Sequence, residues 1–251
     1  MSMQTELRDS RGRVEHWESK LVFEYFQKRS HGFFVEVGAN RPRMFSQTWF
    51  LEEQGWRGIL VEPNPQLCQL LREQRIHSQV FEMALCSPSD VGEADLYLAN
   101  GSGHSAVKPE PGAVLTGERI RVAMRTLDWV LEKGRPGEID FISIDVEGME
   151  LDVLRGFDLT RWQPKLLFIE DIFVNHQKHS YLKSHGYKLI RRTGYNNWYV
   201  PQQTPASLFS VSTPLELFTL TRKFWLNPLY EPIRRWWKER HFRPPLKANR
   251  H

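Results

Sequence analysis

The sequence predicts a doubly wound α/β fold, in which a mostly parallel sheet carries helices on both faces. Short apolar runs alternate along the chain with segments whose apolar residues recur at helical spacing. The runs are rich in aromatic and β-branched residues, as strands covered on both faces require. A closing pair of strands at 187–192 and 198–200 predicts one late antiparallel strand. Together these observations specify parallel strands joined by right-handed crossovers.

The elements follow in a regular order. The helix at 126–133 has Thr126 as its cap and ends at Gly134, and the next helix closes at Gly156. Residues 100–105 and 108–117 are rich in glycine, proline and serine, which is typical of a mobile loop. The buried strands are expected at 33–37, 58–62, 78–85, 140–145 and 165–169, short exposed strands at 93–99 and 119–124, and the helices at 14–28, 49–54, 66–75, 126–133, 149–155 and 176–185.

Length and composition fit one domain with extensions. The 251 residues suggest an N-terminal helical segment at 1–30, a catalytic domain at 31–200, and a linker with a C-terminal extension at 201–251. A hydrophobic content of 40% and a charged content of 25% argue against wholesale disorder. Two cysteines do not suggest a disulfide framework, so a reducing cytoplasm is expected. The polar N-terminus shows no signal peptide, and no apolar run reaches the ~18 residues of a membrane span.

The positive charge is concentrated at the C-terminus. Residues 218–251 contain nine basic and two acidic residues, a net charge of +7, whereas the whole chain carries +4. The rest of the chain is therefore mildly acidic, at −3. Tryptophans interleave with the arginines of this tail, which favours peripheral contact with an anionic membrane at its inner face. Docking of the tail on the domain or on a second subunit is the alternative, and nucleic-acid binding is a third.

Two strand ends predict a nucleoside site. Gly38 follows the first strand and permits a sharp turn, while Glu62 ends the second strand, where an acid can accept both hydroxyls of a ribose. Both NAD and S-adenosylmethionine carry such a ribose. The loop after Gly38 contains one glycine and a proline, which suits the amino-acid end of S-adenosylmethionine better than a pyrophosphate. Pro63 adjoins the ribose acid, and Met83 and Ala84 lie where an adenine ring could rest.

Several motifs in a fixed order resemble the FkbM family of S-adenosylmethionine-dependent methyltransferases. They are FFVEVGAN, SQTWFLEEQGWRGILVEPNP, ALCS, RTLD, IDFISIDVEGMELDVLRGF and LLFIED, spread over residues 32–171. The resemblance implies a Rossmann-like class I methyltransferase sheet, S-adenosylmethionine as cofactor, and O-methylation of a hydroxyl, often on a sugar of a glycolipid or polysaccharide. Many members have a second glycine where this chain has Arg41-Pro-Arg43.

Carried over by position, the family pattern assigns a cofactor role to several residues. Glu62 falls at the ribose acid, and Asp145 faces the sulfonium and the acceptor. The methionine-side loop comprises Glu36, Gly38, Ala39 and Asn40, with Ser46 and Thr48 at the start of the helix beneath it.

Removal of the acceptor proton requires a base or a metal ion. Asp145 is the first candidate for the base and Glu170 the second, and His104 could reach the acceptor from a mobile lid. The acids could instead be helix caps or first-turn charges, which is the competing interpretation for Glu147. In the alternative mechanism, Asp145, Asp171 and Asn175 supply oxygens suited to Mg²⁺.

Other functions remain open at this point. An NAD-binding sugar-nucleotide oxidoreductase would use the same sheet, but the missing glycines and the lack of a Tyr-x-x-x-Lys pair weigh against it. A nucleic-acid methyltransferase recruited by the basic tail would be expected to carry Asn/Asp-Pro-Pro-Tyr after the fourth strand, where Asp-Val-Glu-Gly stands. A binding module without turnover is the third alternative.

Overall fold

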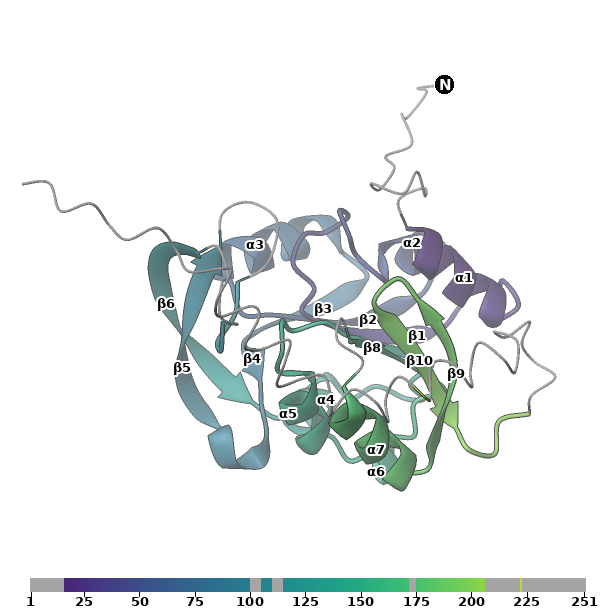
Figure 1. Cartoon of the computed structure of the whole chain (residues 1–251). Helices are drawn as coiled ribbons and strands as arrows, with labels where there is room; N and C mark the ends of the chain where they lie inside the picture. Colours follow the sequence, from purple (N-terminus) through teal and green to yellow (C-terminus); the bar gives the residue numbers. More distant parts are fainter. Residues whose placement is uncertain (1–15, 100–104, 110–114, 172–174, 206–221, 223–251) are drawn as a thin grey trace, which may run out of the picture.

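The computed structural model describes residues 16–99, 105–109, 115–171, 175–205 and 222. Over these residues a seven-stranded sheet lies between two layers of helices, and a smaller three-stranded sheet stands at one end of it (Figure 1). This arrangement confirms the doubly wound α/β prediction. In the described part of the chain, no helix is long and apolar enough to cross a bilayer.

The large sheet has the strand order β3-β2-β1-β7-β8-β10-β9. Its first five strands run parallel, while β10 runs antiparallel to both β8 and β9, so the late antiparallel strand is confirmed. The carboxyl ends of the parallel strands therefore meet along one edge. The bounds are β1 Phe33–Val37, β2 Arg57–Glu62, β3 Ser78–Glu82, β7 Phe141–Ile144, β8 Leu166–Glu170, β9 Tyr187–Thr193 and β10 Asn196–Pro201.

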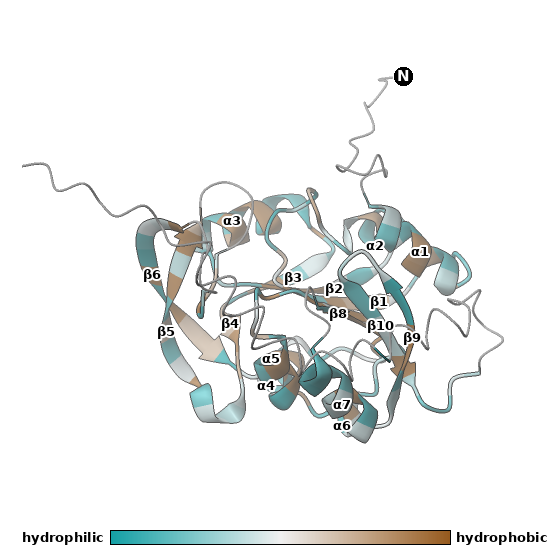
Figure 2. Cartoon of the chain, in the orientation of Figure 1, coloured by the Kyte–Doolittle hydropathy of each residue, from teal (hydrophilic) through white to brown (hydrophobic). Residues whose placement is uncertain are grey.

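Helices cover both faces of the sheet. One layer holds α1 Trp17–Tyr25, α2 Trp49–Glu53 and α3 Pro65–Gln74, and the other holds α4 Leu127–Gly134, α5 Glu150–Arg155, α6 Leu159–Trp162 and α7 His176–Ser184 (Figure 1). Two large clusters of buried apolar side chains correspond to these two layers. Figure 2 shows the central strands mainly in hydrophobic colours, as strands with no solvent-facing side require. The short α6 was not predicted from the sequence.

The chain leaves the large sheet earlier than the sequence suggested. The strand predicted at 78–85 divides at Met83, and β4 Ala84–Leu85 joins β5 Gly92–Ala99 and β6 Leu115–Arg125 in the small sheet, in the order β4-β6-β5. A short 3₁₀ turn, η1 Pro88–Asp90, precedes β5. Strand β6 begins at Leu115, within the predicted loop, because Ala99 of β5 still pairs with it there. The prediction of a loop at 115–117 was therefore wrong.

The N-terminal helix is part of the domain core. Val22 of α1 is fully buried and packs with Phe34, Trp56 and Trp198 in the cluster on that face. The expected membrane contact of the C-terminal extension falls on residues that, apart from Arg222, lie outside the described part, so it stays a prediction.

Candidate active site

Acidic side chains lie at or near the carboxyl ends of four neighbouring strands and share one side of the sheet. In β1, Val35 and Val37 pack with α4 to α7, while Phe34 packs with α1 to α3. Because side chains alternate along a strand, Glu36 points to the same side as Phe34. The same alternation places the acids of the other three strands, Glu62, Asp145 and Glu170, on that side as well. The carboxyl edge of the sheet therefore carries four acids in adjacent positions.

The turn after β1 requires a glycine. Gly38 has φ of +81°, and a Cβ there would lie 1.8 Å from the carbonyl oxygen of Asp145. The N–H groups of Gly38 and Ala39 both donate to the carbonyl of Val61, at 2.9 and 3.0 Å. Strands β1, β2 and β7 are thus drawn together at this point, and only a residue without a side chain fits between them.

Glu62 closes the same turn from the end of β2. Its carboxylate accepts from the N–H of Asn40 at 2.8 Å and from the N–H of Asn64 at 2.9 Å. Each carboxylate oxygen keeps a lone pair for another donor, such as a ribose hydroxyl. Burial raises the pKa of Glu62 to about 7, and the two backbone hydrogen bonds oppose the rise. Pro63 is partly buried beside it, and the N–H of Met83 donates to the Glu62 carbonyl at 3.1 Å.

Glu36 lies beneath this turn and holds the next loop. It accepts from the Ser46 hydroxyl at 2.9 Å, from the Gln47 N–H at 2.6 Å and from the Thr48 hydroxyl. Burial raises the pKa of Glu36, and the guanidinium of Arg75 opposes the rise. Although Thr48 is the N-cap residue of α2, its hydroxyl does not cap the helix; the Ser46 hydroxyl accepts from the Trp49 N–H instead.

Arg75 completes this network, and sequence reasoning missed it. The residue is 1% exposed and donates to the carbonyl of Pro42 at 3.1 Å, to the Ser46 hydroxyl at 3.2 Å and to the Thr48 hydroxyl at 2.8 Å. It also pairs with buried Glu52. The loop between β1 and α2 is therefore held in place by hydrogen bonds of the Glu36, Ser46 and Thr48 side chains.

Asp145 and Glu170 form a carboxyl pair at the tips of β7 and β8. The two side chains hydrogen-bond to each other, and both are partly buried. Burial raises the pKa of Asp145 to about 7, with a further contribution from the charge of Glu147. Burial and the charge of Asp145 raise the pKa of Glu170 further still. Burial and like charge thus keep a proton on this pair at neutral pH.

A buried lysine that the sequence did not reveal ties the two strand tips together. The Lys178 ammonium contacts Glu150 at 3.0 Å and Asp171 at 3.3 Å, and it donates to the Glu170 carbonyl at 2.7 Å. Glu150 in turn accepts from the N–H of Gly148 at 2.9 Å, in the turn that follows Asp145. Burial works to lower the pKa of Lys178, but its two carboxylate partners raise it overall.

The predicted magnesium ligands are used differently. The Asp171 carboxylate accepts from the Asn175 N–H at 2.8 Å and from the Asn197 side chain at 3.0 Å. The Asn175 side chain caps α7 by accepting from the Gln177 N–H. Among the residues with described placement, no three His, Cys, Asp or Glu side chains gather as metal ligands. The sequence expectation of Mg²⁺ thus finds no support in these contacts.

The remaining sequence candidates are the adenine-side pair, Met83 and Ala84, and His104. Ala84 is 8% exposed in β4, next to Met83, so the adenine-side pair remains at the end of the third strand. His104 lies outside the described residues. In β10, Asn196 donates to Glu18 and the Trp198 indole donates to Thr193, so both side chains make contacts within the fold.

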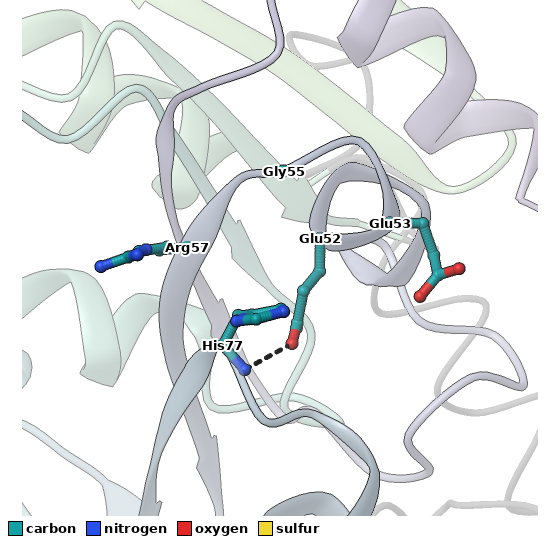
Figure 3. A pocket seen from close by; sticks show the side chains of 5 residues that line it. All are labelled: Glu52, Glu53, Gly55, Arg57 and His77. Carbon is teal, nitrogen blue, oxygen red and sulfur yellow. Dashed lines mark hydrogen bonds between the residues drawn. The ribbon is translucent and has the colours of Figure 1, made fainter.

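A surface cleft lies at the opposite end of the strands. It is lined by Glu52, Glu53, Gly55, Arg57 and His77, at the starts of β2 and β3 (Figure 3). Glu52 accepts from the His77 N–H there at 3.0 Å. None of the four acids at the carboxyl edge lines this cleft, so it is separate from the candidate active site.

A comparison with known protein families identifies the family of this chain. The sequence model described as "Methyltransferase FkbM domain" matches residues 36–195, well over half of the chain. The chain belongs to the FkbM methyltransferase family. It therefore has the fold of class I S-adenosylmethionine-dependent methyltransferases. A search of curated proteins gives no match to this FkbM methyltransferase.

Solved structures similar to this FkbM methyltransferase are distant in sequence. A precorrin-6y C5,15-methyltransferase from Geobacter metallireducens is 8% identical with a TM-score of 0.41, over 80% of this chain and 94% of that chain. TrmK of M. capricolum, in complex with S-adenosylhomocysteine, is 10% identical with a TM-score of 0.40, over 92% and 89%. A TehB-like methyltransferase from Corynebacterium glutamicum is 9% identical with a TM-score of 0.41, over 74% and 88%.

Proposed function

We propose that this protein is an O-methyltransferase that acts on a hydroxyl of a carbohydrate, such as a sugar of a glycolipid or polysaccharide. The observation that carries the proposal is the hydrogen-bonded pair of Asp145 and Glu170 at adjacent strand tips. An alcohol is a weak nucleophile while it is protonated, so its methylation needs a base at the reacting oxygen. A base whose pKa lies near neutral pH is suited to this step, and Asp145 meets that requirement.

The residues at the carboxyl edge fit S-adenosylmethionine. Glu62 offers carboxylate lone pairs for the ribose hydroxyls, and the glycine turn at 38–40 would border the methionine end. Pro63, Met83 and Ala84 would line the nucleoside side. When bound, S-adenosylmethionine supplies a methyl group on a positively charged sulfur, which is released as a neutral thioether once the acceptor oxygen bonds to the methyl carbon.

Asp145 and Glu170 take part in the removal of the acceptor's hydroxyl proton. The Asp145 carboxylate accepts the acceptor's hydroxyl proton as the oxygen bonds to carbon. Glu170 remains protonated, and its hydrogen bond orients the Asp145 carboxylate toward the acceptor. Alignment of the oxygen with the methyl carbon supplies much of the acceleration, since the methyl group is already activated.

Two rival functions predict different ligands. An NAD-dependent sugar-nucleotide oxidoreductase would bind NADH, and the family match together with the single-glycine loop disfavours it. A nucleic-acid methyltransferase would label RNA or DNA.

The tail's contact with an anionic membrane stays a prediction. Equal flotation on liposomes of the full chain and of a chain ending at Pro205 would reject this contact.

A methyl-label transfer screen tests the proposal. Labelled S-adenosylmethionine is offered with sugars, lipid extracts and RNA as acceptors, with and without EDTA. The proposal predicts alkali-stable label on a sugar or glycolipid fraction, and its loss in Asp145→Asn. Transfer to RNA alone, or full turnover by Asp145→Asn, would overturn it.

A further inference from the structure

The segment between β1 and α2 presents large apolar side chains to solvent. Met44 is 40% exposed and Phe45 is 67% exposed. Arg41 and Arg43, which precede Met44 in the chain, are exposed as well. No acidic residue occurs from position 41 to position 51, so the segment carries positive charge only.

Contacts of the neighbouring residues fix the backbone around Phe45. Its φ of +64° lies in the left-handed region, which is costly for a residue with a bulky side chain. The buried guanidinium of Arg75 fixes the segment on both sides, through the Pro42 carbonyl and the Ser46 hydroxyl. The N–H of Ser46 also donates to the Arg43 carbonyl at 3.1 Å. The loop thus presents an aromatic ring from an anchored, unfavourable backbone conformation.

A second exposed aromatic residue lies on the same edge of the sheet. Tyr195, in the turn between β9 and β10, is 51% exposed, and its carbonyl accepts from the Asp171 N–H at 2.9 Å. Glu18 links this turn to the loop, because it accepts from Asn196 at 3.1 Å and from Gln47 at 3.5 Å. We name Met44, Phe45 and Tyr195, with Arg41 and Arg43, the rim patch.

We propose that the rim patch docks on an anionic lipid bilayer, so that the active site opens toward acceptors held in that bilayer. Arginines beside aromatic and methionine side chains match a surface with negative headgroups over an apolar layer. A soluble polyanion would satisfy the arginines but would leave Met44 and Phe45 in water. The inference rests on the proposed function for the acceptor, whereas its test does not need turnover.

The test places an environment-sensitive label at the patch in the full chain. An NBD fluorophore is attached to Phe45→Cys or, as the matched control, to Ile76→Cys. Ile76 is 74% exposed and lies two residues before the start of β3, at the opposite end of the strands. The native Cys68 and Cys86 are buried, and burial raises the pKa of both thiols, so they react slowly.

Vesicles of phosphatidylcholine with phosphatidylglycerol should shift the emission at position 45 to the blue and leave position 76 unchanged. Vesicles of phosphatidylcholine alone should give little change at either position. A Met44→Ser/Phe45→Ser variant should bind the anionic vesicles about tenfold or more weakly than Ile76→Ser in the flotation assay, because it lacks the two apolar side chains that would be buried in the bilayer.

Three results would overturn the docking proposal. One is an unchanged emission at position 45 even though the chain floats with anionic vesicles, which would assign binding elsewhere. Another is an equal shift with soluble heparin, which would indicate a polyanion. The third is undiminished flotation of the double variant. Failure of methyl transfer to any hydroxyl would instead count against the proposed function, and it leaves these readouts intact.

Discussion

Replacement of Lys178 by methionine should strongly destabilise the protein. The Lys178 side chain is 9% exposed, and those of its partners Glu150 and Asp171 are 3% and 1% exposed. Removal of the cation leaves two buried carboxylates without their shared partner. Breaking a buried pair in this way typically costs about 3–5 kcal/mol. For a chain of this size, that loss corresponds to a fall of roughly 6–20 °C in Tm.

Lys165→Met is the matched control. Lys165 is also paired with acids beside β7 and β8, but at the opposite end of the strands, and its side chain is 41% exposed. Asp140 keeps Arg29 as a partner when Lys165 is lost. An exposed pair of this kind contributes about 0–1 kcal/mol.

Urea denaturation of both variants, with the wild type alongside, measures the two losses as shifts in midpoint at constant slope. The loss for Lys178→Met should exceed the Lys165→Met loss by about 2 kcal/mol or more. Equal losses in the two variants would refute the view that Lys178 is the buried tie between the tips of β7 and β8.

Two further predictions concern the glycine turn and the carboxyl pair. Gly38→Ala should lose about 1–3 kcal/mol more unfolding free energy than Gly117→Ala. Both glycines have positive φ, but only a Cβ at position 38 would meet a backbone oxygen. Chemical denaturation measures the two losses, and equal losses would contradict this prediction. The kcat/KM for methyl transfer should rise with pH through about 7, since Asp145 acts only when it is deprotonated and burial raises its pKa. A flat profile from pH 6 to 8 would remove Asp145 as the base.

Much of the site could be predicted because its residues lie within local patterns. Gly38 and Glu62 each follow an apolar run, and the end of such a run fixes where a side chain stands on the sheet edge. The alternation of side chains in the observed strands puts Glu36, Glu62, Asp145 and Glu170 on one side of the sheet. That signal was present in the sequence and could have singled out the pairing of Asp145 with Glu170.

Arg75 and Lys178 could not be found in this way. Each lies in or beside a polar helical segment, where a basic residue is normally solvated. Their burial depends on carboxylates that come from other elements, such as Glu52 for Arg75 and Glu150 for Lys178. The same limit explains why strand 78–85 seemed continuous, since its division depends on the pairing of Ala84 with Met124.

The most direct test of the account is calorimetry with S-adenosylhomocysteine on Glu62→Gln at pH 8, where the wild-type carboxyl is ionised. Glu82→Gln is the control, because Glu82 ends the neighbouring strand β3 in register with Glu62 and is paired with Arg72 at the surface. Loss of hydrogen bonds to a charged group should weaken binding by about 10–100-fold in Glu62→Gln, and binding by Glu82→Gln should match the wild type. Unchanged affinity in Glu62→Gln, or tighter binding of NADH than of S-adenosylhomocysteine by the wild type, would contradict the placement of the cofactor site.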